Sequence, residues 1–293
     1  MPELPEVETV VRGLRPAMEG HCIVAVTLSR PDLRFPFPDN FKTVLNGARI
    51  TALSRRAKYA LADLDNGWVL VMHLGMSGSF RVQDVDTETQ PGQFHHERSK
   101  DTSHDHVRFD METGAQVIYN DPRRFGYMSV VERQALAQHK LFADIGVEPL
   151  GNALSADYLA ARFNGKQVPM KAALLDQRII AGLGNIYVCE ALWRARISPR
   201  RKAASLVRRD GRPTRRLYAL VDDVRAVLDD AIKAGGSSLR DYVHADGSLG
   251  YFQHAFSVYD QEGAPCPRLT CNGVIRRIVQ SGRSTFYCPV CQR

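Results

Sequence analysis

Four cysteines near the C-terminal end constrain the fold of this chain more than any other feature. Cys266 and Cys271 are separated by four residues, Cys288 and Cys291 by two, and 16 residues lie between the pairs. Four thiolates in two such pairs can close a tetrahedral zinc site on two turns of a β-hairpin. A disulfide is disfavoured in a reducing cytoplasm, and an iron–sulfur cluster is the remaining alternative. We therefore predict one structural Zn²⁺ ion per chain, which folds the C-terminal tail.

The chain opens with an amphipathic pattern. Val7, Val10, Val11 and Leu14 recur at helical spacing behind Pro5. Proline is favoured in the first turn of a helix, so the pattern predicts a short helix that begins almost at the first residue. The N-terminus is therefore expected to be held in place rather than frayed.

From residue 21 to residue 131 the pattern changes to alternating β-branched runs. The runs KYALADL and WVLVMHL are joined by Asp65-Asn66-Gly67, which is typical of a hairpin turn. This region is predicted to be an antiparallel β-sandwich. Residues 84–103 are polar without an apolar period and predict a long loop.

Helical spacing returns after a linker at residues 136–153 and persists to residue 235, where Gly235-Gly236 is expected to end the last helix. The remaining tail is too short for a core of its own. The predicted fold class is thus α+β in three parts. These are a β-sandwich with a leading helix (1–135), a helical part that includes the linker (136–235), and a loop with the zinc-binding hairpin (236–293).

Charge favours a polyanionic partner over a small acidic molecule. The formal net charge is +7 and the pI is about 9.2. Ten basic residues fall between Arg194 and Arg216, a density that suits a phosphate backbone but also a solvated face. No apolar run approaches the roughly 20 residues of a membrane span, and the start lacks the features of a signal peptide. We expect a cytoplasmic protein without a membrane partner.

Pro2 is a candidate nucleophile, because chains that begin Met-Pro usually lose the methionine. The exposed amine titrates near ~8, so part of it is neutral at physiological pH. A secondary amine that attacks a sugar C1′ gives only a cationic iminium, which makes the C2′ proton acidic. Glu3 is suited to protonating the opened sugar oxygen. On these two residues alone, a plain helix start is the stronger interpretation.

Seven segments stand in order along essentially the whole chain. They are MPELPEVETVVRGL at the start, RRAKY (55–59), HLGMSGSF (73–80), HDHV (104–107), NDPRRFG (120–126), GLGNIYVCEALW (182–193) and GRSTFYCPVCQ (282–292). Together these segments resemble the formamidopyrimidine-DNA glycosylase family.

One feature departs from that family, whose members mostly have two residues between the first cysteine pair where this chain has four, Pro267–Thr270. The departure concerns the geometry of this knuckle and not its ability to close on zinc.

The resemblance implies a set of catalytic residues. Pro2 would be the Schiff-base nucleophile and Glu3 the proton donor. Lys58, on a strand of the hairpin, would serve as acid and base for β-elimination, a role that arginine cannot fill. Arg283 would grip the phosphates that flank the lesion and is associated with δ-elimination.

The resemblance also implies how DNA is bound. Residues 182–193 would be the second part of a helix-two-turns-helix motif, with Asn185 at a helix N-terminus that faces phosphate. The tail at 236–293 would contain a lesion loop and the zinc finger. Met76, Arg123 and Phe125 would fill the space left when the base is extracted from the stack. The implied DNA-binding residues are His73, His104, Arg123, Lys166, Lys171 and Asn185.

The predicted function is excision of oxidised purines, 8-oxoguanine and formamidopyrimidines, from duplex DNA. An abasic-site lyase activity would follow by β,δ-elimination and leave a one-nucleotide gap with phosphates at both ends. Double-stranded DNA is the expected partner, the protein is expected to be a monomer in the bacterial nucleoid, and no nucleotide cofactor is implied. The alternative is an endonuclease VIII-like enzyme for oxidised pyrimidines, and Leu4 favours the purine branch. A non-catalytic DNA or RNA binder would have no use for Pro2, Glu3 and Lys58 together.

Overall fold

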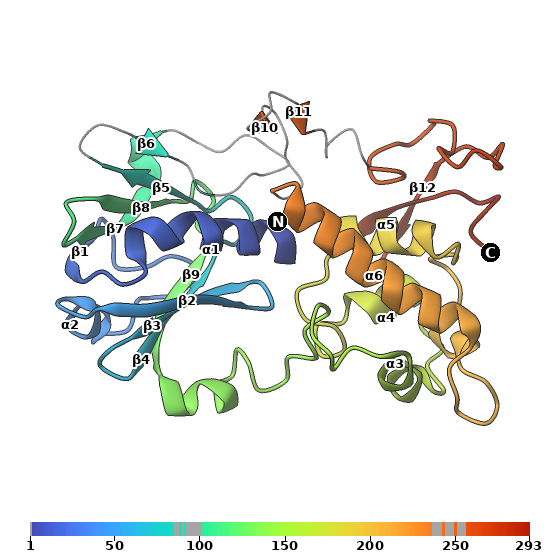
Figure 1. Cartoon of the computed structure of the whole chain (residues 1–293), viewed down its shortest axis with the longest axis horizontal. Coiled ribbons are helices and arrows are strands. Elements are labelled where there is room, and N and C mark those ends of the chain that lie inside the picture. Colours follow the sequence, from blue (N-terminus) through green and yellow to red (C-terminus); the bar gives the residue numbers. More distant parts are fainter. Residues whose placement is uncertain are drawn as a thin grey trace. The chain divides into compact units, whose positions relative to one another are not determined.

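The computed structural model of the chain describes residues 2–84, 88–89, 91, 101–235, 242–243, 249–250 and 256–293. They belong to two compact units (Figure 1). The first runs to Asp144 and also takes Gly235, and the second begins at Ile145 and contains the C-terminal residues.

The first unit is a β-sandwich, as predicted. Its two antiparallel sheets have the strand orders β1-β7-β8-β5-β6 and β2-β3-β4-β9. The elements are α1 (Leu4–Met18), β1 (Ile23–Leu28), α2 (Phe41–Leu45), β2 (Ile50–Arg56), β3 (Tyr59–Leu64), β4 (Trp68–His73), β5 (Ser79–Gln83), β6 (Glu88–Thr89), β7 (Asp105–Met111), β8 (Gln116–Asn120) and β9 (Tyr127–Glu132), with 3₁₀ turns at Thr102–His104 and Arg133–Gln138.

Helix α1 confirms the amphipathic pattern at the start of the chain. Val7, Val10, Val11 and Leu14 are at most 1% exposed and join one core with residues of both sheets. The helix contacts β2 and β3 of one sheet and β5 of the other, and it runs between the sheets in Figure 1. Each such buried valine or leucine contributes about 1.5–3 kcal/mol relative to an exposed one. The start of the chain is therefore part of the sandwich core.

The predicted hairpin at residues 59–73 is also confirmed. Strands β3 and β4 pair antiparallel, and Gly67 takes a positive φ of 82° in their connection. The predicted loop at 84–103 contains a short strand, β6, which pairs with β5. Its last residues, 101–103, lead into β7. The rest of that loop lies outside the described residues.

The second unit is built on helices and ends in a small hairpin. Its two longest helices, α5 (Asn185–Arg194) and α6 (Arg215–Lys233), contact each other. Gly235, with a φ of 82°, follows the end of α6, as expected. The elements are α3 (Ala156–Phe163), α4 (Met170–Leu175), α5 (Asn185–Arg194), a 3₁₀ turn (Ala203–Leu206), α6 (Arg215–Lys233), β10 (Tyr242–Val243), β11 (Leu249–Gly250), β12 (Arg276–Gln280) and β13 (Arg283–Tyr287).

Two features of the units differ from the predicted parts. The 3₁₀ segment at Arg133–Gln138, whose last three residues fall in the predicted linker, contacts β4 and β9 of the first unit. The C-terminal hairpin is not separate from the helices, because Ile275, Phe286 and Cys288 share a small core with Cys189 of α5. The hairpin therefore obtains the core that its own length cannot provide.

Cys189 is a buried core thiol, as the sequence suggests, at 1% exposure. The same expectation for Cys22 is wrong, because this residue is only half-buried at the edge of β1. Its neighbours there include Arg49 and Glu112, and its backbone N–H donates to Glu112 Oε1 at 3.0 Å. Polar neighbours and partial exposure make this a surface thiol.

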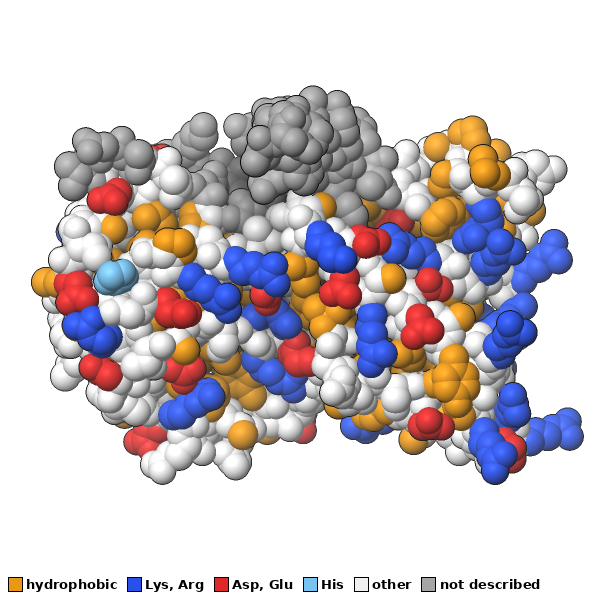
Figure 2. All heavy atoms as spheres, viewed as in Figure 1, with side chains coloured by type: hydrophobic (Ala, Val, Ile, Leu, Met, Phe, Trp, Pro, Cys, Tyr) orange, Lys and Arg blue, Asp and Glu red, His pale blue; other side chains and the backbone are white. Residues whose placement is uncertain are grey.

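The basic stretch from Arg194 to Arg216 lies on the surface of the second unit, where many Lys and Arg side chains appear on the right of Figure 2. Arg208, Arg209 and Arg215 are exposed. Among the described residues, no helix is both long and apolar enough to cross a membrane.

Glu190 of α5 holds residues 257–259, which precede the C-terminal hairpin, in place. Its carboxylate is 3% exposed and accepts backbone N–H groups of Ser257, Val258 and Tyr259 at 2.9, 2.9 and 2.8 Å. Burial raises the pKa of this carboxyl, and the three N–H donors oppose that rise. The segment that leads into the zinc hairpin thus depends on one buried acid.

We expect Glu190→Gln to destabilise the second unit by about 2 kcal/mol, because the glutamine N–H₂ would face a backbone donor and leave it unsatisfied. Urea unfolding followed by Trp193 fluorescence, in a Trp68→Phe background, measures the change. Glu132→Gln, at an exposed position of the first unit, is the control. Equal midpoints for Glu190→Gln and the control would show that the buried carboxylate does not hold this segment.

Candidate functional site

The first turn of α1 holds Pro2 and Glu3 inside the first unit. Glu3 is the N-cap residue, and its side chain accepts a hydrogen bond from the backbone N–H of Glu6. In return, the backbone N–H of Glu3 donates to Glu6 Oε2 at 2.7 Å. This capping box satisfies N–H groups that a helix start otherwise leaves open. Pro2 is buried, and Glu3 and Glu6 are 4% and 2% exposed, so the start of the chain is fixed in place.

Lys58 lies in the two-residue turn between β2 and β3, and the expectation that it lies on a strand is wrong. The turn is possible because Ala57 adopts a positive φ of 54°. Arg55 supports it by donating to the Ala57 carbonyl at 2.8 Å, and the same guanidinium pairs with Glu8 of α1 at 3.2 Å. The turn that carries Lys58, itself 8% exposed, is thereby tied to the helix that begins beside Pro2.

His73 at the end of β4 is held as a neutral ring. Burial lowers the pKa of His73 to about 4, and the nearby cations Lys58 and Arg34 lower it further. The His73 Nδ1 atom accepts the backbone N–H of Gly75 at 3.0 Å. The proton of the neutral ring therefore resides on Nε2, and this N–H can donate to an anionic oxygen.

Asp121 joins two loops, the one after β4 and the one after β8. It is fully buried, and it accepts from Ser77 Oγ at 2.5 Å and from the backbone N–H of Gly126 at 2.8 Å. Tyr119 Oη donates to the same carboxylate at 3.3 Å, and the Arg123 N–H donates to Ser77 Oγ at 3.2 Å. One carboxylate thus fixes both loops.

The same loops touch backbone to backbone. Gly75 has a φ of +63°, and a Cβ added there would lie 2.3 Å from the carbonyl carbon of Phe125. The predicted wedge residues stand on these loops, with Met76 and Phe125 37% and 44% exposed and the Arg123 guanidinium 4.9 Å from the Phe125 ring. Beside them is a depression of about 460 Å³, lined by Asp32, Leu33, Arg34, Arg123, Arg124 and Phe125.

His104 lies next to this network. Its carbonyl accepts the N–H of Asp121 at 3.0 Å, and its half-buried ring lies 3.7 Å from a carboxylate oxygen of Asp101. Asn120 Nδ2 donates to the Asp101 carbonyl at 2.8 Å. The structure therefore brings His104 and the Arg123 loop together.

In the second unit, a glutamine fixes the two turns between α4 and α5. Gln177 Oε1 accepts the N–H of Gly182 at 2.9 Å, and its Nε2 donates to the carbonyls of Leu175 and Leu183 at 3.1 and 2.8 Å. Helix α5 then begins at Asn185. The first N–H groups of a helix lack partners within it, which makes this end suited to an anion.

The carbonyl of Ser284 joins this helix start to the zinc hairpin. It accepts from Asn185 Nδ2 at 3.0 Å and from Lys171 Nζ at 2.8 Å, and the same ammonium donates to Thr285 Oγ1 at 2.6 Å. Lys171 is 1% exposed, so its charge is directed to the hairpin rather than to solvent. Lys166, by contrast, is half-buried in the turn after α3.

The tip of the hairpin presents Arg283. Ser281 and Gly282 take positive φ values of 49° and 71°, as a two-residue turn that matches the strand twist requires. Arg276, Arg277 and Arg283 are all exposed around it. The tip is therefore a tight basic turn whose arginine side chains can bind phosphate.

The four C-terminal cysteines converge as predicted. Their Sγ atoms all lie within 4.8 Å of one another, with Cys266 and Cys291 3.8 Å apart and Cys271 and Cys288 3.6 Å apart. Zn–S bonds of about 2.3 Å in a tetrahedron place sulfur atoms about 3.8 Å apart. The thiols therefore fit a structural zinc ion, and the four-residue knuckle closes on it.

A β-sandwich in which Pro2 is buried and a helix start reached through two turns are features of helix-two-turns-helix DNA glycosylases, and comparison with known proteins agrees. Residues 1–128 match the family model described as the formamidopyrimidine-DNA glycosylase N-terminal domain. Residues 145–243 match the H2TH domain of the same glycosylase, and residues 263–293 match the zinc finger found in FPG and IleRS. The chain belongs to the formamidopyrimidine-DNA glycosylase family.

Similar proteins cover the whole chain. A formamidopyrimidine-DNA glycosylase of Sinorhizobium fredii is 62% identical and one of Rhizobium meliloti 61% identical, each over 100% of both chains. The solved complex of Lactococcus lactis Fpg with DNA containing an abasic site has a TM-score of 0.82 at 33% identity, over 100% of both chains. A complex of a mutant of that protein with Fapy-dG containing DNA has a TM-score of 0.83.

Several residues that shape the site were missed by the sequence reasoning. Asp121 lies in the segment NDPRRFG and Ser77 in the segment HLGMSGSF, so their place in these segments could have identified them as site residues. Glu6 stands three residues after Glu3, the spacing of a capping box. Gln177 had no signal, because its three partners are set by the fold of the turns.

We expect Ser77→Ala to destabilise the first unit by about 1–3 kcal/mol, because it removes a donor from the buried Asp121 carboxylate. Tyr119→Phe removes only two longer contacts, to Asp121 at 3.3 Å and to the Leu74 carbonyl at 3.4 Å, and should have a smaller effect. Chemical unfolding followed by Trp68 fluorescence, in a Trp193→Phe background, measures both. Equal stabilities of Ser77→Ala and the parent would contradict the role of Asp121 as the junction of the two loops.

The low pKa of His73 predicts a pH dependence of stability. The unfolded ring titrates near 6.5 and the folded ring near about 4. The unfolded state therefore binds more protons between these values, and the contribution of His73 is full above pH ~6.5 and lost as the pH falls towards 4. Unfolding free energies measured across this range should fall less steeply for His73→Gln than for the parent, and identical slopes would show that His73 is not held neutral.

Proposed function

We propose that this protein excises oxidised purines from duplex DNA and then cleaves the strand at the abasic site. The observation that carries the proposal is the start of α1, where Pro2 is buried and Glu3 is fixed by the capping box with Glu6. Glu3 is 4% exposed and directly follows Pro2, so an acid stands beside the proposed nucleophile. The names of the 61–62% identical relatives support the same substrate class.

In the proposed reaction the neutral amine of Pro2, free after loss of Met1, attacks C1′ of the damaged nucleotide. The bond from C1′ to the base breaks, and the base leaves with its electron pair and a proton. Glu3 protonates O4′ as the sugar ring opens, which gives the Pro2 iminium. Lys58 then removes the C2′ proton, and the 3′ phosphate leaves by β-elimination. In a second elimination the C4′ proton is removed, the C5′–O bond breaks, and the 5′ phosphate leaves with the electron pair of that bond.

The described residues suit the phosphate contacts that this reaction needs. Arg283 stands exposed at the tip of the hairpin, and its guanidinium can hold phosphate bidentately during the second elimination. The N-terminal end of α5, the Nε2–H of His73, and the side chains of Lys166 and His104 are proposed to bind the DNA backbone. For Lys171 the buried contacts favour a bracing role on β13 over a direct contact.

Met76, Arg123 and Phe125 are proposed to fill the gap left by the extracted base. Met76 and Phe125 support this role because they are 37% and 44% exposed on two loops that touch, where apolar and planar groups can replace a stacked base. The shared junction at Asp121 would keep the two loops in register while the base leaves the stack. The four cysteines would hold a zinc ion that maintains the hairpin and supplies no step of the reaction.

Oxidised pyrimidines are the alternative substrate class. One solved complex pairs wild-type Lactococcus lactis Fpg with DNA that contains an oxidised pyrimidine, so a family member can bind such a lesion. Leu4 and the NDPRRFG loop favour the purine class in this chain.

Borohydride trapping tests nucleophile and substrate together. The protein is mixed with duplexes that contain 8-oxoguanine or thymine glycol, reduced, and mapped by peptide mass spectrometry. We expect a covalent adduct at Pro2, with faster trapping on 8-oxoguanine, because reduction converts the iminium to a stable amine. The matched control retains one residue in front of Pro2, so that its nitrogen is an amide, and should give no adduct.

Faster trapping on thymine glycol would assign the protein to the pyrimidine class. An adduct at another residue would refute Pro2 as the nucleophile. Binding of both duplexes without any adduct would refute the lyase activity.

A further inference from the structure

The first cysteine knuckle carries an arginine that is bonded to the end of α5. Arg268 lies between Cys266 and Cys271, and its Nη2 donates to the carbonyls of Trp193 and Arg194 at 2.9 and 3.4 Å. These carbonyls belong to the last turn of α5, and the Trp193 carbonyl also accepts the backbone N–H of Arg196 at 3.1 Å. A cation at this end is also favoured by the helix dipole.

Trp193 connects the same arginine to a zinc ligand. The guanidinium carbon of Arg268 lies 4.6 Å from the centre of the Trp193 ring, and the indole N–H donates to Cys266 Sγ at 3.4 Å. The side chain of Trp193 therefore contacts the knuckle at Cys266, which is predicted to bind the ion, and at Arg268 two residues further on. A thiolate at Cys266 would strengthen this N–H···S contact.

The opposite end of α5 is bonded to the second strand of the hairpin. Asn185, its first residue, donates to the Ser284 carbonyl at 3.0 Å, directly beside Arg283. Helix α5 thus spans the distance between the first knuckle and the strand that carries Arg283. Its two ends set the position of both parts.

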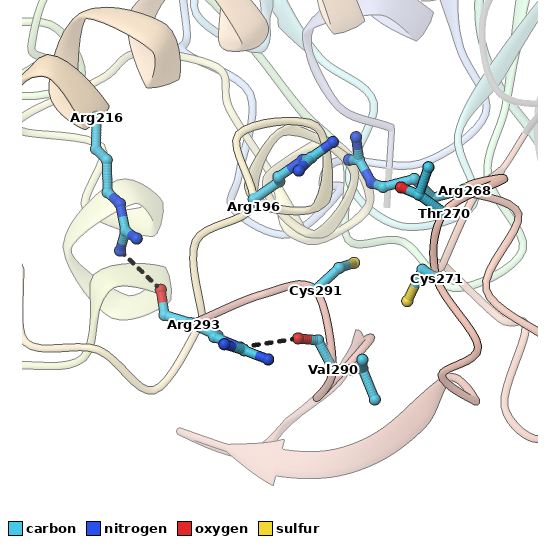
Figure 3. A pocket seen from close by; sticks show the side chains of 8 residues that line it. All are labelled: Arg196, Arg216, Arg268, Thr270, Cys271, Val290, Cys291 and Arg293. Carbon is cyan, nitrogen blue, oxygen red and sulfur yellow. Dashed lines mark hydrogen bonds between the residues drawn. The ribbon is translucent and has the colours of Figure 1, made fainter.

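The electrostatics of the knuckle favour the zinc-bound state. Figure 3 shows the guanidinium groups of Arg196 and Arg268 pointing towards each other over a pocket of about 330 Å³, with Cys271 and Cys291 on its wall. No acidic side chain is among the lining residues, but Asp223 of α6 interacts with Arg268, whose charge opposes the rise that burial causes in the pKa of the Asp223 carboxyl. Four thiolates carry more negative charge than one divalent ion cancels, so the zinc-bound centre is anionic and would offset these cations.

We propose that Arg268 is a positioning residue that fastens the zinc knuckle to the C-terminal end of α5 and thereby fixes the strand that carries Arg283. The link to Arg283 and its elimination step rests on the proposed function. The link to zinc retention does not.

The test uses the full-length, zinc-loaded protein with Arg268→Met, Arg268→Lys and the control Arg209→Met, which removes an exposed arginine of the same unit. The first readout is the rate of zinc transfer to a chromogenic chelator. Loss of charge-assisted hydrogen bonds predicts at least about tenfold faster release for Arg268→Met. Lysine can still donate to the carbonyls but cannot stack as a planar fork, so its release rate should be intermediate.

The second readout is the product pattern on abasic-site DNA. We expect Arg268→Met to trap at Pro2 as the parent does but to carry a smaller fraction of product through the second elimination, with partial rescue by lysine. The Arg209 variant should match the parent in both readouts. If Arg268→Met is poorly folded, Trp193→Phe keeps an aromatic ring beside Arg268 but removes the N–H···S contact, and it should release zinc faster by a smaller factor.

Zinc release at the parental rate from both Arg268→Met and Trp193→Phe would overturn the proposal. Faster release with an unchanged product pattern would overturn the link to Arg283 and leave the fastening of the knuckle. If the parent itself yields no product of the second elimination, the proposed function fails at that step, and the zinc measurement still decides whether Arg268 fastens the knuckle.

Discussion

The fold of the first unit depends on keeping the beginning of the chain still. Backbone N–H groups at a helix start lack partners, and a terminal segment normally frays. Here the exchange of hydrogen bonds between Glu3 and Glu6 closes the first turn of α1, and the apolar stripe behind it is buried between two sheets. Glu8, one turn further on, extends this order to the Lys58 turn through Arg55. Two candidate catalytic segments are thus anchored on one helix.

In the second unit, a single backbone oxygen, the carbonyl of Ser284, holds separate segments in place. A carbonyl has two lone pairs, and that of Ser284 uses them for Lys171 and Asn185. The ammonium and the amide come from α4 and from the start of α5, so both helices meet the hairpin at the residue next to Arg283. A buried lysine is tolerated there because its charge is fully used by hydrogen bonds. Rigid helices therefore set the position of a residue on a small hairpin with little core of its own.

The parts of the site that follow from local spacing were predictable from the sequence. Cys266, Cys271, Cys288 and Cys291 follow a spacing rule, and the helix behind Pro5 follows from its period. Contacts between distant segments were not predictable. The junction at Asp121 needs Ser77 from another loop, and the position of Lys58 in a turn depends on Ala57 accepting a positive φ that alanine rarely takes. The burial of Lys171 likewise depends on a partner more than 100 residues away in the chain.

The close approach of Gly75 to the backbone of Phe125 limits how these loops can diverge. A side chain at position 75 would meet the neighbouring loop's backbone, and both loops end on the same carboxylate. Neither loop can change its path alone. A transfer of one loop into a related protein would therefore have to include the other loop and Asp121. Side chains at the exposed ends of the loops, such as Met76 and Phe125, can vary without this constraint, because the contacts that fix the loops are made by the backbone and by buried groups.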